Sequence, residues 1–330
     1  MKTPLTLTLL AALFVTSPAA AQYSARRSGT RVELEDSANQ IVVSIEPGAG
    51  NKTQSMTVKG RNVLAAQGIP FMAPWANRLD EQAFYANGRK YPFNMELGNI
   101  RGAHPIHGFL GTASQWEVVE AKSDASSAWV TSRLEFFRQP VWVAQFPFAH
   151  TIEITHRLQN GALEIAATLH NLSADPMPVA IGFHPYFTLG DAPRDDWRIA
   201  IGARTEWLLS ADKLPTGETR PIEQRFADPR AAKLGEHDLD HVFGDLTRDQ
   251  AGRSVMSVTG KREKLEVVYG PNYRASVVYA PKGREFICFE PMAGITNALN
   301  LAQRGVYKEL QYVQPGQTWR ESFWIRPAGF

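Results

Sequence analysis

The sequence contains a single cysteine, Cys288, among its 330 residues. An intramolecular disulfide and a zinc site built from several cysteines are therefore both excluded. The chain also lacks an excess of either charge, because 35 Lys and Arg residues face 33 Asp and Glu residues, for a net charge of +2. Nucleic-acid binding driven by overall charge needs a strongly basic domain, so we expect no nucleic-acid partner.

Long apolar runs are also lacking. The stretch 5–15 has eleven mostly apolar residues, fewer than the roughly 20 that a membrane-spanning helix needs. It follows Met1 and Lys2 and precedes Ala19-Ala20-Ala21, a small-residue pattern that signal peptidase recognises. We predict a cleaved signal peptide over 1–21 and an exported protein, periplasmic or secreted, with no membrane attachment after cleavage. An uncleaved anchor or a buried strand is the alternative.

Alternating apolar and polar residues, typical of strands with one buried face, recur through the rest of the chain. The clearest example is 150–171, where the alternation runs on both sides of Asn160-Gly161. Asn-Gly favours the positive φ angles of a tight turn, which predicts an antiparallel hairpin. Similar runs predict strands at 32–36, 40–45, 116–120, 128–137, 177–181, 265–269, 275–279, 285–289 and 319–325.

Helical periodicity is scarce, with one short turn expected at 228–234, and no fixed repeat or Pro/Ser-rich linker divides the chain. We therefore predict an all-β fold, a single-domain, large antiparallel β-sandwich over 22–330. A sheet of this kind can carry a concave face lined by polar residues, where a site is to be sought.

Histidines are the first candidates for chemistry. Three of the eight, His150, His156 and His170, fall in the predicted hairpin and are interpreted as structural. His104 and His107 have the spacing of a metal pair, but they lie in a segment broken by Gly and Pro, without a third ligand at suitable spacing. We predict no metal site.

Two further residues interrupt apolar segments. His184 lies in Gly-Phe-His-Pro-Tyr-Phe (182–187), where aromatic neighbours desolvate the imidazole and lower its pKa. It is either a core histidine or a proton donor and acceptor near neutral pH. Glu290 ends the apolar run that begins at Phe286, immediately before Pro291. It is either a solvated edge residue or a general base held at the end of a strand.

A set of polar and aromatic residues completes the candidates. Asp240, Asn77 and Arg78 offer the carboxylate, amide and guanidinium groups that bind hydroxyl-rich ligands. Trp75 or Tyr186 offers a ring face on which a sugar can stack.

Five motifs in order resemble the aldose 1-epimerase (galactose mutarotase-like) family, over about residues 32–326. They are Pro-Trp-Ala-Asn-Arg (74–78), His-Gly-Phe (107–109), Gly-Phe-His-Pro-Tyr-Phe (182–187), Leu-Asp-His-Val-Phe (239–243) and Cys-Phe-Glu-Pro-Met (288–292). The family fold is a large antiparallel β-sandwich, in agreement with the alternation.

The resemblance implies a role for each matching residue. Glu290 is similar to the family's general base, which takes the proton of the anomeric hydroxyl, and His184 to the acid that protonates the ring oxygen. His107 is similar to a second histidine that binds and polarises the sugar near that oxygen. Asp240 matches an aspartate that holds sugar hydroxyls, and Arg78 matches an arginine that orients the substrate. The implied reaction interconverts the α and β anomers of a free monosaccharide without a metal, nucleotide or redox cofactor.

One departure leaves the substrate open. Galactose-specific members carry Asn-His before the Tyr-Phe pair, whereas Phe183-His184-Pro185 stands here, as in a broader group that includes hexose-6-phosphate mutarotases. Export argues against a phosphorylated hexose. Two further interpretations stay open: a non-catalytic carbohydrate-binding protein, and a glycoside hydrolase or lyase that uses Asp240 and Glu290 as a carboxylate pair. Both a monomer and a homodimer are compatible with the sequence.

Overall fold

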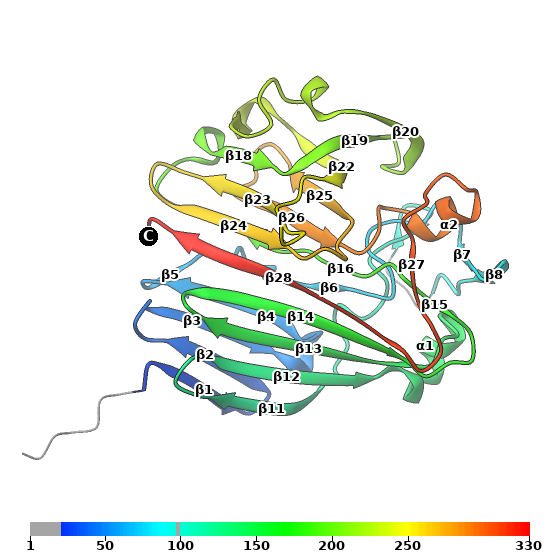
Figure 1. Cartoon of the computed structure of the whole chain (residues 1–330), viewed down its shortest axis with the longest axis horizontal. Coiled ribbons are helices and arrows are strands. Elements are labelled where there is room, and N and C mark those ends of the chain that lie inside the picture. The colour runs from blue at the N-terminus through cyan, green and yellow to red at the C-terminus, as the bar shows by residue number, and fades with distance from the viewer. Residues whose placement is uncertain (1–20, 97–99) are drawn as a thin grey trace, which may run out of the picture.

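Antiparallel β-sheets make up most of the computed structural model, which describes residues 21–96 and 100–330 (Figure 1). The signal peptide predicted over 1–21 lies outside the described residues except for Ala21, and it remains a prediction.

The largest sheet has nine strands. In spatial order they are β11 (Glu117–Ser123), β12 (Ala128–Glu135), β13 (His150–Gln159), β14 (Ala162–Asn171), β28 (Thr318–Ala328), β24 (Lys264–Tyr269), β23 (Ser254–Thr259), β18 (Arg198–Ile201) and β21 (Ala232–Lys233). The C-terminal strand β28 therefore lies in the middle of this sheet, between strands from two distant parts of the sequence (Figure 1).

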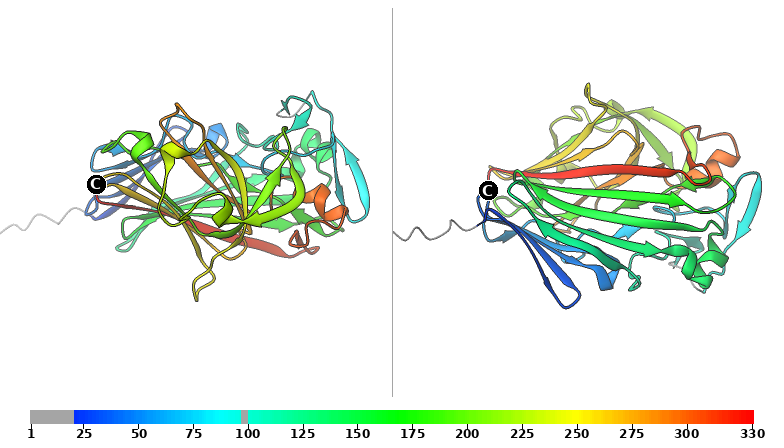
Figure 2. Two further views of the ribbon diagram at one scale, coloured as in Figure 1. Left: turned by 90° about the horizontal axis from the view of Figure 1, so that it is seen from above. Right: turned by 60° about the horizontal axis from the view of Figure 1, so that its bottom comes forward.

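Two smaller sheets cover this one. The five-stranded sheet comprises β1 (Tyr23–Ser28), β2 (Arg31–Asp36), β3 (Ile41–Glu46), β4 (Lys52–Val58) and β5 (Arg61–Asn62). Its strands β1 and β2 contact β11, β12 and β13, so it packs on one end of the large sheet (Figure 2).

The other sheet, with eight strands, carries the candidate site. Its order is β20 (Pro215–Pro221), β19 (Ala203–Leu209), β22 (Leu239–Leu246), β25 (Ala275–Ala280), β26 (Ile287–Met292), β16 (Gly182–Phe183) and β6 (Phe71–Met72), and β17 (Tyr186–Phe187) also pairs with β26.

Short elements fill the connections. Three two-stranded ribbons pair β7 (Ala83–Ala86) with β8 (Arg89–Pro92), β9 (Ile100–Arg101) with β10 (His104–Pro105), and β15 (Met177–Val179) with β27 (Gln311–Val313). The described residues form two α-helices, α1 (Pro140–Gln145) and α2 (Ala298–Gln303). Within residues 21–96 and 100–330, neither helix has the length and apolar character that crossing a membrane requires.

The eight-stranded sheet presents two chemically different faces because side chains alternate along each strand. Phe183 and Phe289 point into the sandwich, where the Phe183 ring lies 5.0 Å from that of Phe323 on β28. The next residues along the chain, His184 and Glu290, therefore point to the opposite face. This outer face holds the cavity described below.

Most predicted strands are confirmed within a few residues. The hairpin of β13 and β14 pairs His150 with Asn171 and Gln159 with Ala162, and Asn160 and Gly161 both have positive φ angles, 51° and 73°, as a tight turn requires. The turn expected at 228–234 is replaced by the short strand β21 and a 3₁₀ turn at Leu234–Glu236.

One strand boundary is wrong in a way that affects the site. Glu290 does not end its strand, because β26 continues through Pro291 to Met292. The backbone N–H of Ala293 donates to the carbonyl of Ile181, on the side of β16. Every second residue of a strand directs its backbone groups to the same neighbouring strand, so Pro291 also faces this side, but it has no N–H to donate. The missing bond falls where the neighbouring chain leaves β16 and later resumes as β17.

Candidate active site

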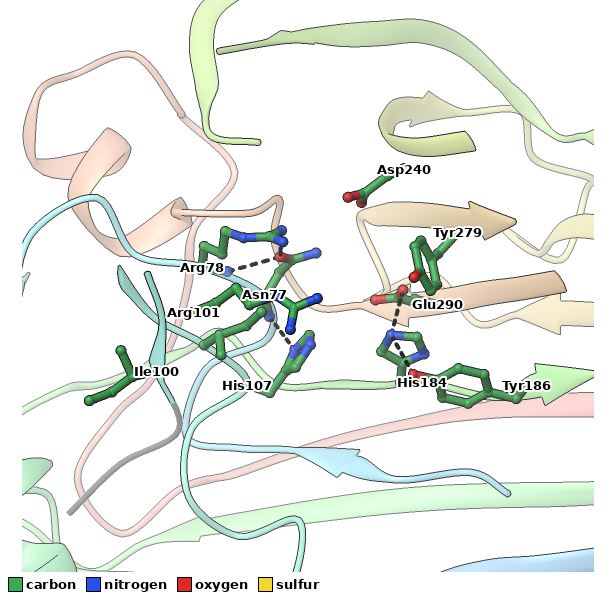
Figure 3. Close-up of a pocket in the computed structure, with 11 residues that line it drawn as sticks. Asn77, Arg78, Ile100, Arg101, His107, His184, Tyr186, Asp240, Tyr279 and Glu290 are labelled. Carbon is green, nitrogen blue, oxygen red and sulfur yellow. Dashed lines mark hydrogen bonds and ion pairs between the residues drawn. The ribbon is translucent and has the colours of Figure 1, made fainter. Parts of the chain in front are cut away.

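A cavity of about 440 Å³ opens on the outer face of the eight-stranded sheet (Figure 3). Seven of the eight predicted site residues line it, and Trp75 does not. The lining residues are Asn77, Arg78, Ile100, Arg101, Ile106, His107, His184, Tyr186, Asp240, Tyr279 and Glu290.

Strand register brings His184 and Glu290 together. On one side of the gap in the ladder Gly182 pairs with Met292, and on the other side Tyr186 pairs with Cys288. Both pairs belong to one antiparallel register, which places His184 opposite Glu290. Directly opposed residues of an antiparallel pair lie on the same face with their side chains close together.

The two side chains are in direct contact. Nε2 of His184 lies 3.2 Å from Oε1 of Glu290, and both residues are buried, with exposed fractions of 8% and 1%. Oε2 of Glu290 is buried and has no hydrogen-bond partner among the described residues, so it can accept a hydrogen bond from a bound hydroxyl group.

Burial shifts both groups toward their neutral forms. Desolvation raises the pKa of Glu290 well above its usual value, and the negative charge of Asp240 adds to this effect while Arg78 opposes it. Desolvation also lowers the pKa of His184, and His107 contributes in the same direction. Near neutral pH this combination favours a pair that holds one proton between its two members.

His107 approaches His184 from a loop, with ring centroids 5.4 Å apart. The backbone N–H of His107 donates to the carbonyl of Asn77. In return, Nδ1 of the His107 ring accepts the backbone N–H of Asn77 at 3.2 Å. Burial, with Arg78 and Arg101 nearby, lowers the pKa of His107 to about 4. The ring is therefore neutral at pH 7 with its proton on Nε2, so that it can donate a hydrogen bond into the cavity.

Charged groups occupy opposite walls of the cavity. Arg78 donates to Oδ1 of Asn77 at 3.1 Å, and Arg101, from β9, lies beside it (Figure 3). Asp240, from β22, lies on the other side with Glu290 (Figure 3). The two walls together can hold several hydroxyl groups of one ligand.

Two tyrosines complete the wall around His184. The ring of Tyr186 stacks on that of His184 with centroids 4.4 Å apart, and its hydroxyl lies 3.4 Å from Nε2 of the same histidine. Tyr279 meets His184 edge to face. These contacts hold the imidazole in one orientation.

The prediction that Trp75 offers a stacking surface is wrong. Its side chain is 2% exposed and packs against Phe93 and Phe109, away from the cavity. The motif Pro-Trp-Ala-Asn-Arg (74–78) mixes apolar and polar residues, so it does not indicate on which side the tryptophan ring lies.

None of the other six histidines is among the residues that line the cavity. His150 and His156 are buried in the hairpin, and His170 lies near Thr318 on its surface. His104 contacts the carbonyl of Leu79. No group of three or more potential metal ligands occurs in the described residues.

Four cavity residues were missed from the sequence, namely Ile100, Arg101, Ile106 and Tyr279. Tyr279 ends a run of residues that was predicted as a strand, but the strand pairing that places it beside Asp240 and Cys288 is seen in the structure alone. Arg101 lies in a two-residue strand, and no periodicity marks it.

The family is established independently of the site geometry. The sequence profile of the family described as aldose 1-epimerase matches residues 31–326. The chain belongs to the aldose 1-epimerase family. Membership in this family implies an epimerase, an enzyme of the isomerase class, that acts on sugars.

Solved structures of other members share its fold. A galactose mutarotase-like protein from Clostridium acetobutylicum superimposes with a TM-score of 0.81 at 19% identity, covering 93% of this chain and 98% of the other. Galactose 1-epimerase from Lactobacillus acidophilus NCFM gives a TM-score of 0.72 at 15% identity, covering 93% and 98%. At these identities the similarity establishes the large antiparallel β-sandwich of the family.

Proposed function

We propose that the protein is a mutarotase that interconverts the α and β anomers of an aldose by opening and closing the sugar ring. The observation that carries this proposal is the 3.2 Å contact between His184 and Glu290 in the cavity. The ring oxygen and the anomeric hydroxyl are bonded to the same carbon, so an acid and a base that act on both must be neighbours.

In the proposed mechanism Glu290 takes the proton from the anomeric hydroxyl, and His184 gives a proton to the ring oxygen. The bond between C1 and the ring oxygen breaks, and the electron pair of the O–H bond forms the aldehyde carbonyl. Rotation about C1–C2 turns the other face of the aldehyde to the ring hydroxyl. Closure reverses both proton transfers and yields the opposite anomer.

The single proton held by the pair suits this cycle. Before ring opening the proton of the pair moves from Glu290 to His184 across their 3.2 Å contact. Ring opening then converts protonated His184 and ionised Glu290 into neutral His184 and protonated Glu290, so the pair holds one proton throughout. No proton has to enter from the solvent during turnover. A positioned acid or base contributes on the order of 10²–10⁴-fold to the rate.

The neighbouring groups then have defined roles. The Nε2–H of neutral His107 donates to the ring oxygen, and it stabilises the charge that develops there as the C–O bond breaks. Arg78, Asn77 and Asp240 hold the sugar hydroxyls, and Tyr186 keeps His184 oriented.

Measurement of mutarotation tests the proposal against its two competitors. Freshly dissolved α-glucose and α-galactose are followed by polarimetry, with the buffer-catalysed rate as reference. We expect clear acceleration for at least one sugar. Sugar binding without acceleration would favour a carbohydrate-binding protein, and release of reducing ends or unsaturated products from a polysaccharide would favour a hydrolase or lyase.

We further propose that the protein works outside the cytoplasm, on the strength of the leader-like segment 1–21. N-terminal sequencing of the protein from an exporting bacterial host is expected to begin at Gln22. A chain that keeps residues 1–21 and stays in the cytoplasm would contradict export.

A further inference from the structure

The Arg78 loop, which we define as residues 77–80, is held from two sides. On one side the backbone N–H of Leu79 donates to the carbonyl of Pro105 at 3.0 Å. Pro105 lies two residues before His107, so this bond joins the Arg78 loop to the loop of that histidine. The two loops form one wall of the cavity.

On the other side, Asp80 ties the Arg78 loop to helix α2. Its backbone N–H donates to Oδ1 of Asn297 at 3.2 Å, and its Oδ1 accepts a hydrogen bond from Nδ2 of Asn300 at 2.8 Å. Its other carboxylate oxygen forms an ion pair with Arg304. Asn297 immediately precedes α2, Asn300 lies within it and Arg304 immediately follows it, so the contacts of one aspartate extend along the whole helix.

The contacts of Asp80 are largely shielded from water. Its side chain is 18% exposed, and Asn297 and Asn300 are buried. Burial alone would raise the pKa of Asp80, but hydrogen bonds from Asn300 and Arg304 lower it below its usual value. The carboxylate is therefore ionised at neutral pH, and hydrogen bonds to an ionised group are stronger than those between neutral groups.

Helix α2 is connected directly to the strand of Glu290. Strand β26 ends at Met292, and α2 begins after the connection 293–297. The helix also packs against β7, which follows the Arg78 loop in the chain (Figure 1). Asp80 therefore links the wall that carries Arg78 to the element that continues from the strand of the proposed base.

We propose that Asp80 is a positioning residue, which fixes the Arg78 loop against helix α2 and thereby places Asn77 and Arg78 relative to Glu290. Asp80 itself is not among the residues that line the cavity. In the proposed mechanism Asn77 and Arg78 bind sugar hydroxyls and take no part in proton transfer. Contacts that are equal in the ground state and the transition state affect KM and leave kcat nearly unchanged. The inference rests on the proposed mutarotase function and adds to it a residue outside the cavity.

Truncation of Asp80 tests the proposal, with the neighbouring carboxylate as the matched control. Anomer exchange is measured by NMR over a range of concentrations of the sugar that the wild type accelerates most. We expect Asp80→Ala to raise KM about three- to tenfold, with kcat within about twofold of the wild type, because bonds to an ionised group are lost. Glu81→Ala removes a carboxylate that also pairs with Arg304, but its other partners, Tyr85 and Lys90, belong to the β7–β8 ribbon. We expect its KM to equal that of the wild type.

A purely structural role of Asp80 would give a different pattern. A variant that folds less well contains less active enzyme, so its apparent kcat falls while its KM stays the same. An unchanged KM in Asp80→Ala, or an equal rise of KM in Glu81→Ala, would overturn the proposal.

Two milder variants guard against a folding defect. Asp80→Asn keeps an acceptor for Asn300 but loses the charge that pairs with Arg304, and Arg304→Gln removes the same ion pair from a side chain that is 43% exposed. Each should raise KM less than Asp80→Ala does. The double variant should raise KM no further than Asp80→Asn alone, because both changes break one contact. Rises of KM that multiply in the double variant would contradict the assigned role.

Hydrogen exchange separates this inference from the function beneath it. The amide protons of Arg78, Leu79 and Asp80 are all hydrogen-bonded, and their exchange is followed by mass spectrometry without any sugar. We expect faster exchange over 77–80 in Asp80→Ala than in the wild type or Glu81→Ala. If no sugar is accelerated, the proposed function fails, and this measurement still decides whether Asp80 holds the loop. Exchange in Asp80→Ala as slow as in the wild type would overturn the inference.

Discussion

His184 and Glu290 are two groups that burial drives toward neutrality, yet the reaction needs one of them as a base and the other as an acid. Their direct contact reconciles these demands, because one proton can serve both groups in turn. With two groups in contact, one can donate a proton while the other accepts one in the same step. Their pairing at 3.2 Å is therefore the central feature of the site.

The pH dependence of the reaction follows from the directions of the two pKa shifts. Below the lowered pKa of His184 the pair gains a second proton and loses its base, and above the raised pKa of Glu290 it loses its acid. We expect a bell-shaped profile of kcat/KM, with an acid limb below the usual histidine value of 6.5. Initial rates across a buffer series measure it. A rate that rises steadily with pH through the neutral range would contradict the one-proton pair.

The protonation state of His107 leads to a second prediction. His107→Asn keeps an acceptor for the N–H of Asn77 but removes the Nε2–H donor, and asparagine tolerates the φ of 59° found here. We expect kcat/KM to fall about 10²-fold, as for the loss of one preorganised donor. His107→Gln, which carries an amide donor further along the side chain, should lose less. Equal rates in both variants and the wild type would remove His107 from the mechanism.

At the level of single residues, the sequence predicted which residues belong to the site better than it predicted where each side chain lies. Seven of the eight predicted site residues line the cavity, because acids, bases and arginines in apolar segments are conspicuous. The prediction for Trp75 was wrong because an aromatic ring is equally suited to a hydrophobic core and to a sugar-binding site. Arg101 was missed because an exposed arginine near a glycine is ordinary in sequence.

At the level of elements, the gap between β16 and β17 creates the site. Pro291 cannot donate to the neighbouring strand, and the chain leaves the ladder at His184 and returns at Tyr186. Sequence alternation predicted the strands on either side but not their pairing. The register that sets His184 opposite Glu290 joins segments about a hundred residues apart, which no local pattern encodes.

The loop that carries His107 depends on a close backbone approach at Gly108. A Cβ atom there would lie 1.9 Å from the carbonyl oxygen of Ala73, and its φ is +58°. Gly108→Ala should lower the melting temperature and displace His107, with a loss of activity of up to about 10²-fold. Thermal unfolding and mutarotation rates measure the two effects.

Gly29→Ala is the matched control, because Gly29 has a similar φ of +62° and nothing within 4 Å of an added Cβ. Both variants pay the cost of the left-handed conformation, roughly 1 kcal/mol. Only Gly108→Ala also meets the clash. Similar losses of stability and activity in the two variants would show that the close approach has no special role.

At the level of the whole molecule, the small net charge concealed a local clustering of positive side chains. The net charge of +2 over 330 residues argued against a strongly basic surface, but Arg78, Arg101 and Lys213 line one hollow beside the cavity. Amino-acid composition is summed over the whole chain, so it cannot show where charged side chains cluster. The all-β fold, by contrast, was predictable, because alternation extends through most of the chain.

Replacement of Glu290 by glutamine tests the central claim most directly. The amide keeps the shape of the side chain but cannot take a proton, so the rate of anomer exchange measured by NMR should fall on the order of 10²–10⁴-fold, with sugar binding largely retained. Glu285→Gln, which changes an exposed carboxylate two residues before the same strand, should exchange anomers at the wild-type rate. A Glu290→Gln enzyme that is folded and as fast as the wild type would contradict the account.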